Sequence, residues 1–371
     1  MLAKEKKIKL IISGGGTGGH IFPAIAIAQA IQKLHPFSEF LFIGAKGKME
    51  MEKIPAAGFA IEGLWISGLQ RNQVLKNLLF PLKLISSLWN ARRIIKKFNP
   101  DVVVGVGGYA SGPTLFMANQ LNIPTLIQEQ NSYPGITNKM VSKKVNTICV
   151  AYPDMEIHFP KSKLIETGNP IRKHIIQTEG KREKAFKHFG LVAHKKTVLL
   201  IGGSLGAQSI NHAIIAHIKE WQSSEFQLIW QTGISGIADA ELLISNNNTA
   251  NISVHQFIIE MDLAYAAADL VISRAGAIAI SELCAVAKAC ILIPLPSAAE
   301  DHQTKNAKRL AEKKAAVLLP NQDAAEKLFD ICSNLLKDEK KLEELRINIK
   351  RFAKTDADIE IAKEVLKLIA N

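Results

Sequence analysis

The chain has 371 residues, of which 47% are hydrophobic and 22% are charged, a balance that is typical of globular proteins and excludes a disordered chain. This length exceeds one ordinary hydrophobic core, so we expect two domains. The formal net charge of +12 suits nucleic acid, anionic lipid or phosphorylated substrates as partners and does not choose among them.

The first part of the chain alternates apolar strands with helical patterns. Residues 7–13 are typical of a buried strand, and a glycine loop at 14–19 and a helical pattern at 23–34 follow. The next predicted strands are 39–43, 101–106 and 125–128. This alternation predicts a parallel sheet with helices on both faces.

The same pattern starts again in the second half. A strand at 196–201 is followed by a glycine loop at 202–206 and by a helix from about Ala207. The later predicted strands are 227–231, 252–255, 270–273 and 289–294. We therefore predict two α/β units in tandem, joined near 168–170, with a last helix over 359–369.

The first glycine loop matches a known phosphate-binding pattern only in part. Gly14, Gly16 and Gly19 form GxGxxG between a strand and a helix, the context of a dinucleotide site. That site also needs an acid at the end of the second strand, and the sequence has none there before Glu50. The Walker pattern GxxxxGK[ST] does not occur either, so we reject a nicotinamide or P-loop site and expect no cofactor.

The number of glycine loops is more informative than any one of them. They lie at 14–19, 105–113 and 202–206, each before a helix whose N-terminus favours phosphate. One such loop is often only a tight turn that needs glycine. Three loops favour a site that handles two pyrophosphates, one in each domain.

Seven motifs in chain order carry a family resemblance. They are 14–24, 107–113, 128–131 with 134–135 and 138–139, 168–172, 202–207 with Asn211, 274–283, and 301–303 with Asn306. On these motifs the chain resembles the MurG family over nearly its whole length. At Leu205 and Ala279 the family commonly has Gln and Thr, which puts individual donor contacts in doubt but not the class of donor.

The resemblance implies an α/β fold of GT-B type, with two Rossmann-like parallel-sheet domains facing across a cleft. The N-terminal acceptor- and membrane-binding domain would comprise residues 1–168 and 352–371, with the C-terminal helix crossing back onto it, and the C-terminal UDP-sugar-binding domain would comprise residues 169–351. The implied reaction is the inverting transfer of N-acetylglucosamine from UDP-GlcNAc to the 4-hydroxyl of N-acetylmuramic acid in lipid I. It forms lipid II for peptidoglycan synthesis and requires no metal.

The resemblance also implies the donor site. Glu282 would accept hydrogen bonds from both ribose hydroxyls, Arg172 would neutralise the leaving diphosphate, and Ile258 would bind uracil through its backbone. The donor residues that it implies are Thr17, Gly18, Asn131, Arg172, Ser204, Ile258, Ala277, Glu282 and Gln303.

On the acceptor side, His20 is the best candidate for the general base, because histidine exchanges protons near neutral pH. Glu129 is the rival base, and His20 would then orient the acceptor or cap its helix. The residues implied at the acceptor and its pyrophosphate are Gly16, Gly19, Gly108, Tyr109 and Ser111, and Thr17 and Asn131 also resemble acceptor-side residues.

Residues 63–100 contain seven Lys or Arg residues and no Asp or Glu. Within them an apolar stripe that includes Leu75, Leu79 and Trp89 predicts insertion into an anionic membrane surface, and the alternative is a helix that packs on the sheet. Pro81 interrupts the stripe, so we expect two helices or a kinked one. No nucleic-acid-binding module is present, so we do not expect nucleic acid as a partner.

No window reaches the roughly 18 apolar residues of a membrane-spanning helix, so we expect a peripheral protein. The resemblance implies the cytoplasmic face of the inner membrane, with cell-wall or cell-division proteins as partners. Two alternative functions are another lipid-acceptor UDP-sugar transferase, of the diacylglycerol type, and a non-catalytic protein that binds nucleotide sugars.

Overall fold

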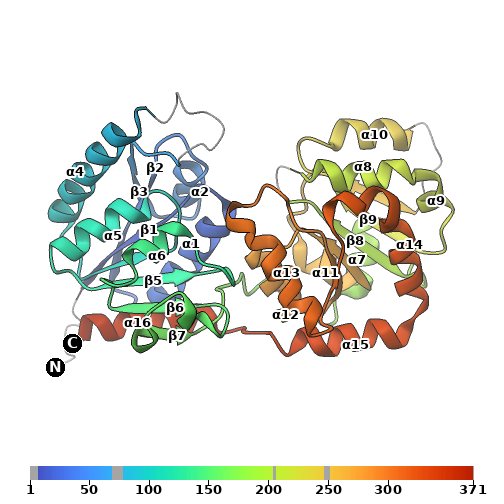
Figure 1. Cartoon of the computed structure of the whole chain (residues 1–371). Helices are drawn as coiled ribbons and strands as arrows, with labels where there is room; N and C mark the ends of the chain where they lie inside the picture. Colours follow the sequence, from blue (N-terminus) through green and yellow to red (C-terminus); the bar gives the residue numbers. More distant parts are fainter. Residues whose placement is uncertain (1–6, 69–77, 204–205, 246–250, 371) are drawn as a thin grey trace. The chain divides into compact units, whose positions relative to one another are not determined.

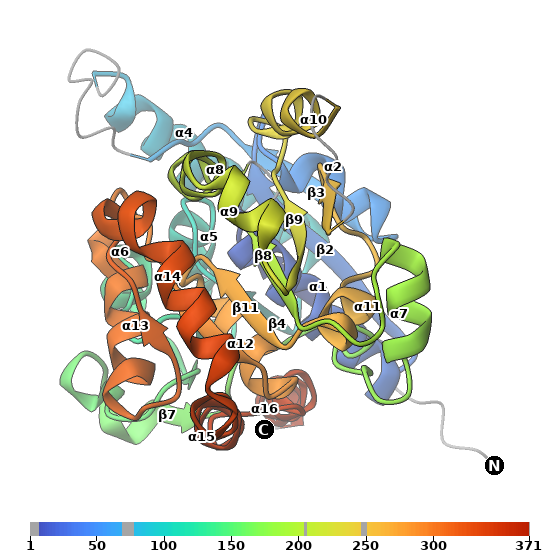
Figure 2. The same cartoon turned by 90° about the vertical axis from the view of Figure 1, so that its right-hand side faces the viewer.

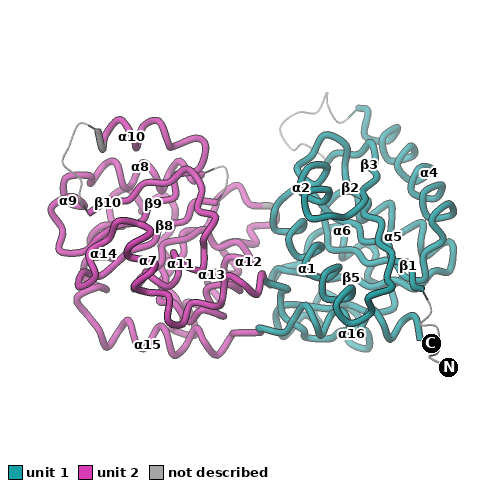
Figure 3. The backbone as a smooth tube through the Cα atoms, turned by 180° about the vertical axis from the view of Figure 1, so that it is seen from behind, with its two compact units in different colours: residues 1–171, 355–371 teal, residues 172–354 magenta. Residues whose placement is uncertain are grey.

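The computed structural model of the chain describes residues 7–68, 78–203, 206–245 and 251–370 (Figure 1). Two predicted site residues, Leu75 and Ser204, lie outside these ranges. The chain divides into two compact units, one of Met1–Ile171 with Thr355–Asn371 and one of Arg172–Lys354 (Figure 3). The sequence had placed the two joins at 168/169 and 351/352.

The first unit is built on a seven-stranded sheet in the order β3-β2-β1-β4-β5-β6-β7, and all its strand pairs are parallel. Its strands are β1 (Ile8–Ser13), β2 (Ser38–Ala45), β3 (Ala60–Leu64), β4 (Val102–Gly105), β5 (Thr125–Glu129), β6 (Thr147–Val150) and β7 (Leu164–Glu166). The central strands are continuous apolar runs because helices cover both faces of the sheet.

The helices of the first unit are α1 (Gly18–Leu34), α2 (Glu50–Ala56), α4 (Phe80–Phe98), α5 (Ser111–Gln120), α6 (Ile136–Val141) and α16 (Ala357–Ala370). Side chains of α4 and α5 share one core with the sheet, and those of α1 and α16 share the other. Helix α16 belongs to this unit because Ile361, Ala362 and Val365 are buried against α1 and the sheet.

The sequence predicted two helices or a kinked one at Pro81, and residues 69–77, where a preceding helix would lie, are outside the described ranges. Pro81 lies in the first turn of α4, which then continues to Phe98. A proline fits there because the first backbone N–H groups of a helix have no partner within the helix.

The second unit has a six-stranded parallel sheet in the order β10-β9-β8-β11-β12-β13. Its strands are β8 (Thr197–Ile201), β9 (Gln227–Gln231), β10 (Ile252–His255), β11 (Leu270–Ser273), β12 (Ala289–Leu292) and β13 (Val317–Leu318). The first six strands of unit 1 follow the same order, which is that of the doubly wound nucleotide-binding fold. The predicted α/β class with two parallel sheets is confirmed.

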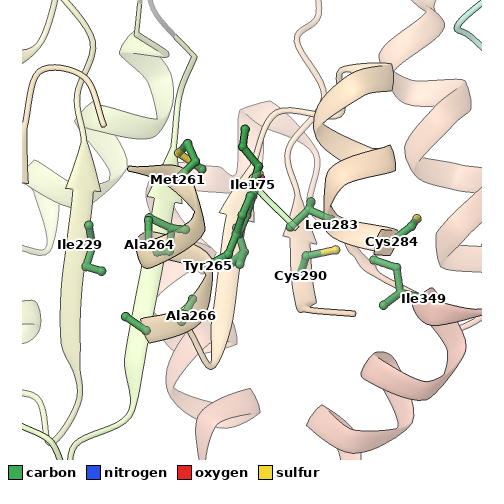
Figure 4. Packing of buried hydrophobic residues seen from close by; sticks show 14 of the residues in the cluster. Ile175, Ile229, Met261, Ala264, Tyr265, Ala266, Leu283, Cys284, Cys290 and Ile349 are labelled. Carbon is green, nitrogen blue, oxygen red and sulfur yellow. The ribbon is translucent and has the colours of Figure 1, made fainter. Parts of the chain in front are cut away.

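The helices of the second unit are α7 (Arg182–Phe189), α8 (Gln208–Ala216), α9 (Ile218–Ser223), α10 (Ile237–Ser245), α11 (Met261–Ala267), α12 (Ala277–Ala285), α13 (His302–Glu312), α14 (Ala324–Lys337) and α15 (Glu339–Lys350). Figure 2 shows α8 and α14 on one side of the sheet and α7 and α11 on the other. In the core beneath α11, the ring of Tyr265 is buried in the same cluster as Ile175 and Leu283 (Figure 4).

Candidate active site

The glycine loops of the first unit follow two adjacent strands. Ser13, the last residue of β1, pairs with Gly105, the last residue of β4, so the first and second loops leave the same edge of the sheet side by side. The order in which the strands are added to the sheet reverses between β1 and β4, and such a topological switch point is where doubly wound sheets bind ligands.

The two loops are in direct contact, and glycine is required there. Gly107 and Gly108 have φ of +92° and +88°, values that other residues rarely adopt. A Cβ on Gly108 would lie 2.3 Å from the carbonyl oxygen of Gly15, and one on Gly107 would lie 2.9 Å from Nε2 of His20. The second loop therefore packs against both the first loop and the imidazole.

His20 lies in the first turn of α1, and its ring is held by the loop that precedes it. Its Nδ1 is 3.0 Å from the carbonyl oxygen of Gly15 and 3.3 Å from Oγ1 of Thr17. A carbonyl only accepts hydrogen bonds, so Nδ1 carries the proton that it donates to Gly15. In the neutral ring the lone pair is then on Nε2, which is the form that a general base needs.

Glu50 is the acid of this site that the sequence analysis passed over. It is buried in the first turn of α2, and its carboxylate accepts from the backbone N–H groups of Gly16 (2.9 Å) and Ala45 (3.0 Å). A Cβ on Gly15 would lie 2.1 Å from this carboxylate, so glycine is required at Gly15 as well. The available signal was its position just after the end of β2, where a dinucleotide site has its acid.

Glu129 ends β5 and organises the loop that follows. Its buried carboxylate accepts from the backbone N–H groups of Asn131 (3.0 Å) and Gly135 (3.1 Å), and from the side-chain amides of Asn131 (3.2 Å) and Asn138 (2.9 Å). Because four donors share its two oxygens, Glu129 is a weaker candidate for the base than His20.

The remaining acceptor-side candidates differ in exposure. Gly16, Thr17 and Gly19 are exposed and Gly18 is half-buried, whereas the hydroxyl of the buried Ser111 donates to the carbonyl oxygen of Gly108 (3.0 Å). The half-exposed ring of Tyr109 lies against Gly68, where a Cβ would be 2.0 Å from its Cζ.

In the second unit the central group is an ion pair around Glu282. Glu282 lies on α12 with only 5% of its surface exposed. Its Oε1 accepts from Nη2 (3.1 Å) and Nε (3.3 Å) of Arg172, and its Oε2 accepts from the hydroxyl of Tyr265 (3.4 Å). Burial raises the pKa of Glu282, and the charge of Arg172 acts against that rise. The structure thus brings two predicted donor residues together and adds Tyr265, which sequence patterns did not indicate.

The other donor candidates lie at the same edge of the second sheet. Ile201 of β8 pairs with Ser273 of β11, so the third glycine loop and the segment leading to α12 leave adjacent strands. Ala277 is the first residue of α12, and no acid occupies the first turn of that helix. This helix N-terminus suits a diphosphate.

Ile258 and Gln303 both take part in hydrogen bonds that shape this edge. The backbone N–H of the buried Ile258 donates to Oε1 of Gln231 (3.0 Å). The backbone group of Ile258 that we consider for binding uracil is therefore its carbonyl oxygen. Oε1 of Gln303 accepts from the backbone N–H of Leu295 (2.9 Å).

Within the described residues, no three His, Cys, Asp or Glu side chains come together in a way that would hold a metal ion. None of the helices in the described ranges is both long and apolar enough to cross a membrane.

The chain belongs to glycosyltransferase family 28. The model of the family's N-terminal domain matches residues 10–150, and that of its C-terminal domain matches residues 197–361. These matches and the relatives described next confirm the resemblance to the MurG family.

Two relatives are named UDP-N-acetylglucosamine–N-acetylmuramyl-(pentapeptide) pyrophosphoryl-undecaprenol N-acetylglucosamine transferase. That of Bacteroides fragilis is 50% identical, and the match covers 97% of this chain and 96% of the relative. That of Flavobacterium psychrophilum is 50% identical, and the match covers 98% of each chain. The crystal structure of Acinetobacter baumannii MurG is similar with a TM-score of 0.77 and 27% identity, over 97% of this chain and 99% of that one.

Proposed function

We propose that this protein transfers N-acetylglucosamine from UDP-GlcNAc to the 4-hydroxyl of N-acetylmuramic acid in lipid I, which produces lipid II and UDP. The observation that carries the proposal is the 50% identity along 97% of the chain to a relative named for this transfer. The site geometry supports it, because the first unit presents a histidine with the proton on Nδ1 and the second presents a buried carboxylate beside an arginine.

The second unit binds the donor. Glu282 accepts from the ribose hydroxyls, and the N-terminus of α12 at Ala277, with Arg172, compensates the charge of the diphosphate. For this, Arg172 exchanges part of its contact with Glu282 for the diphosphate. The carbonyl oxygen of Ile258 accepts from uracil, and Gln303 and Ser204 contact the sugar and the diphosphate.

The first unit handles the acceptor. Nε2 of His20 takes the proton of the 4-hydroxyl while the hydroxyl oxygen attacks the anomeric carbon of the donor from the face opposite UDP. The new bond forms as the bond to the diphosphate oxygen breaks, so the anomeric configuration inverts and UDP leaves with the electron pair. Glu129 holds Asn131 and the rest of its loop in place for the acceptor, which Thr17 and Tyr109 also contact.

Helix α4 is the proposed contact with the membrane surface. Leu79, which caps the start of α4, and Leu82, Ile85 and Trp89 within it have 49%, 58%, 65% and 64% of their surfaces exposed, while the helix residues Ser87, Ala91, Ile94 and Ile95 are buried. The side chains of α4 that pack in the core and the apolar side chains that are exposed therefore lie on different faces of the helix. Arg92, Arg93, Lys96 and Lys97 are exposed along it, which suits anionic headgroups.

This contact would hold the protein at the cytoplasmic face of the inner membrane, where the lipid-linked acceptor is available. Exposed apolar stripes beside cations are typical of peripheral helices. The family resemblance also predicts cell-wall or cell-division proteins as partners.

The test is UDP release from UDP-GlcNAc with and without a water-soluble lipid I analogue. We expect UDP to form only with the acceptor, in equal amount to the disaccharide product. UDP release with a diacylglycerol acceptor instead would favour the other lipid transferase, and UDP-GlcNAc binding without turnover would favour a non-catalytic binding protein.

A further inference from the structure

A single peptide group connects Glu50 to His20. The N–H of Gly16 donates to Oε2 of Glu50 (2.9 Å), and the carbonyl oxygen of Gly15 is 3.0 Å from Nδ1 of His20. That N–H and that C=O belong to the same peptide unit, the one between Gly15 and Gly16. We propose that Glu50 is a positioning residue for His20 and acts through this peptide, an inference that rests on the proposed function of His20 as the general base.

The physical basis is the polarisability of the peptide group. Resonance couples its N–H and C=O, so a carboxylate that accepts from the N–H increases the negative charge on the carbonyl oxygen. The carbonyl then accepts more strongly from Nδ1–H of His20, which fixes the ring orientation and makes Nε2 more basic. In serine proteases an aspartate does this by contacting the imidazole directly. Here the contact passes through one peptide unit.

The surroundings of Glu50 hold its carboxylate in this position. Glu50 is 1% exposed, and its other oxygen accepts from the backbone N–H of Ala45 (3.0 Å). The backbone approaches it closely, since a Cβ on Gly44 would lie 2.6 Å from Cγ of Glu50. Glycine at Gly44 and Gly15 thus makes room for this carboxylate between β2 and the first loop.

The same contact changes the expected role of the first loop. In a dinucleotide site the loop amides bind the pyrophosphate. Here the N–H of Gly16, which was predicted to contact the acceptor pyrophosphate, donates to a carboxylate of the protein itself. A phosphate at this amide would be repelled by Glu50, so the loop serves to hold His20.

The test compares Glu50→Gln, which removes the charge, with Glu52→Gln as the matched control. Glu52 lies on the same helix and is exposed. We expect kcat with a soluble lipid I analogue to fall about ten- to a hundredfold in Glu50→Gln, as for other partners of a reacting group, and to stay unchanged in the control. The Kd for UDP should not change in either variant, and thermal unfolding followed by circular dichroism shows whether each variant is folded.

A spectroscopic measurement separates this role from a merely structural one. In wild-type protein labelled with ¹⁵N-histidine, well above the ordinary histidine pKa of about 6.5, the His20 signals should report an unprotonated Nε2. Glu50→Gln should shift the balance toward the other tautomer. His20→Asn assigns the signals, and Glu50→Asp, which keeps the charge but is too short for both N–H groups, serves if the Gln variant does not fold.

The inference is overturned if wild-type His20 carries its proton on Nε2, or if Glu50→Gln keeps both kcat and the tautomer of the wild type. Failure of this inference can be distinguished from failure of the proposed function. If the wild type releases no UDP with the acceptor, the proposed function is wrong, while the tautomer measurement still decides whether Glu50 controls His20.

Discussion

The two units share a strand order but use their buried acid in different ways. In the first unit Glu50 accepts only from backbone N–H groups in its described contacts, and one of them belongs to the glycine loop. In the second unit Glu282 accepts from the side chains of Arg172 and Tyr265. Both acids are almost fully buried at the edge of the sheet where the loops emerge.

This difference shows that one fold can support two chemical tasks. A carboxylate that is bonded to the backbone shapes a loop and does not exchange its partners easily. A carboxylate paired with an arginine that is one-third exposed can exchange that partner for a ligand. The first arrangement suits the positioning of a base, and the second suits the binding of a donor that arrives and leaves.

The largest expected effect is the fall in kcat when His20, the proposed base in the first unit, is replaced. His20→Asn should lower kcat about a thousandfold, because a positioned general base contributes two to four orders of magnitude. The KM for UDP-GlcNAc should stay within a few-fold of the wild type, since the donor contacts lie in the other unit. Steady-state kinetics with a soluble acceptor measure both, with the exposed His194 replaced in His194→Asn as a control. A His20 variant with wild-type kcat would remove the histidine from the chemistry.

The next effect concerns Glu282. Glu282→Gln should raise the KM for UDP-GlcNAc about ten- to a hundredfold, because a hydrogen bond to a charged group is worth about 1.5–3 kcal/mol and Arg172 loses its partner. Glu326→Gln, an exposed acid on α14, should have no effect. Wild-type kinetics of Glu282→Gln at subsaturating donor would exclude the ribose assignment.

The pH dependence of donor binding follows from the same residue. Burial raises the pKa of Glu282, and the donor needs its carboxylate form. Donor affinity should therefore be full above that raised pKa and fall as the pH drops through it, at a higher pH than for an ordinary glutamate. The Kd for UDP, measured at several pH values from about 4.5, near the ordinary pKa of glutamate, to about 8, should show this loss of affinity in the wild type. Glu282→Gln should not show it.

Helix α4 of the first unit is expected to bind the membrane surface. Replacing Leu82, Ile85 and Trp89 by Ser should weaken binding to anionic vesicles about tenfold, because each apolar side chain adds to insertion. Transfer to a soluble acceptor should be unchanged, and salt should weaken wild-type binding. Leu34, Phe37 and Ile157 are exposed elsewhere on the same unit, and their Ser variants form the control. Wild-type vesicle binding by the folded α4 variant would place the membrane contact elsewhere.

A smaller effect is expected at Tyr265. Tyr265→Phe removes one hydrogen bond to Glu282 and keeps the buried ring, so UDP affinity should fall about fivefold, the equivalent of about 1 kcal/mol. Tyr109→Phe, in the first unit, should leave UDP affinity as it is. Isothermal titration of both variants measures this, and an unchanged Kd in Tyr265→Phe would show that the hydroxyl does not support Glu282.

The smallest effect is expected on chelation. The N-terminus of α12 and Arg172 supply positive charge near the proposed diphosphate position, so EDTA should leave the rate of UDP release unchanged. A loss of activity that Mg²⁺ or Mn²⁺ restores would show that these groups are not sufficient.

The sequence predicted the central strands of both sheets, because they are short apolar runs, but it did not predict β3, β6, β7 and β13, which lie toward the edges of the sheets. Thr197–Ile201 and Gln227–Gln231 are examples of the predicted strands, each with at most one end residue different from the prediction. The sequence also indicated that His20 lies directly after the first glycine loop, and the structure places it in the first turn of α1.

The contacts of Glu50 and Glu282 could not be predicted from the sequence. Glu50 lies 34 residues from Gly16 in the chain, and Tyr265 lies 17 from Glu282, so neither pairing leaves a local pattern. Sequence periodicity reports which face of an element is buried but not which buried side chain meets which backbone group.

The most direct test of the division between the units is the Kd for UDP, measured by isothermal titration on the wild type, His20→Asn and Glu282→Gln. If the second unit binds the donor and the first supplies the base, His20→Asn binds UDP as the wild type does and Glu282→Gln binds it about ten- to a hundredfold more weakly. Loss of UDP binding in His20→Asn, or wild-type binding in Glu282→Gln, would contradict this division.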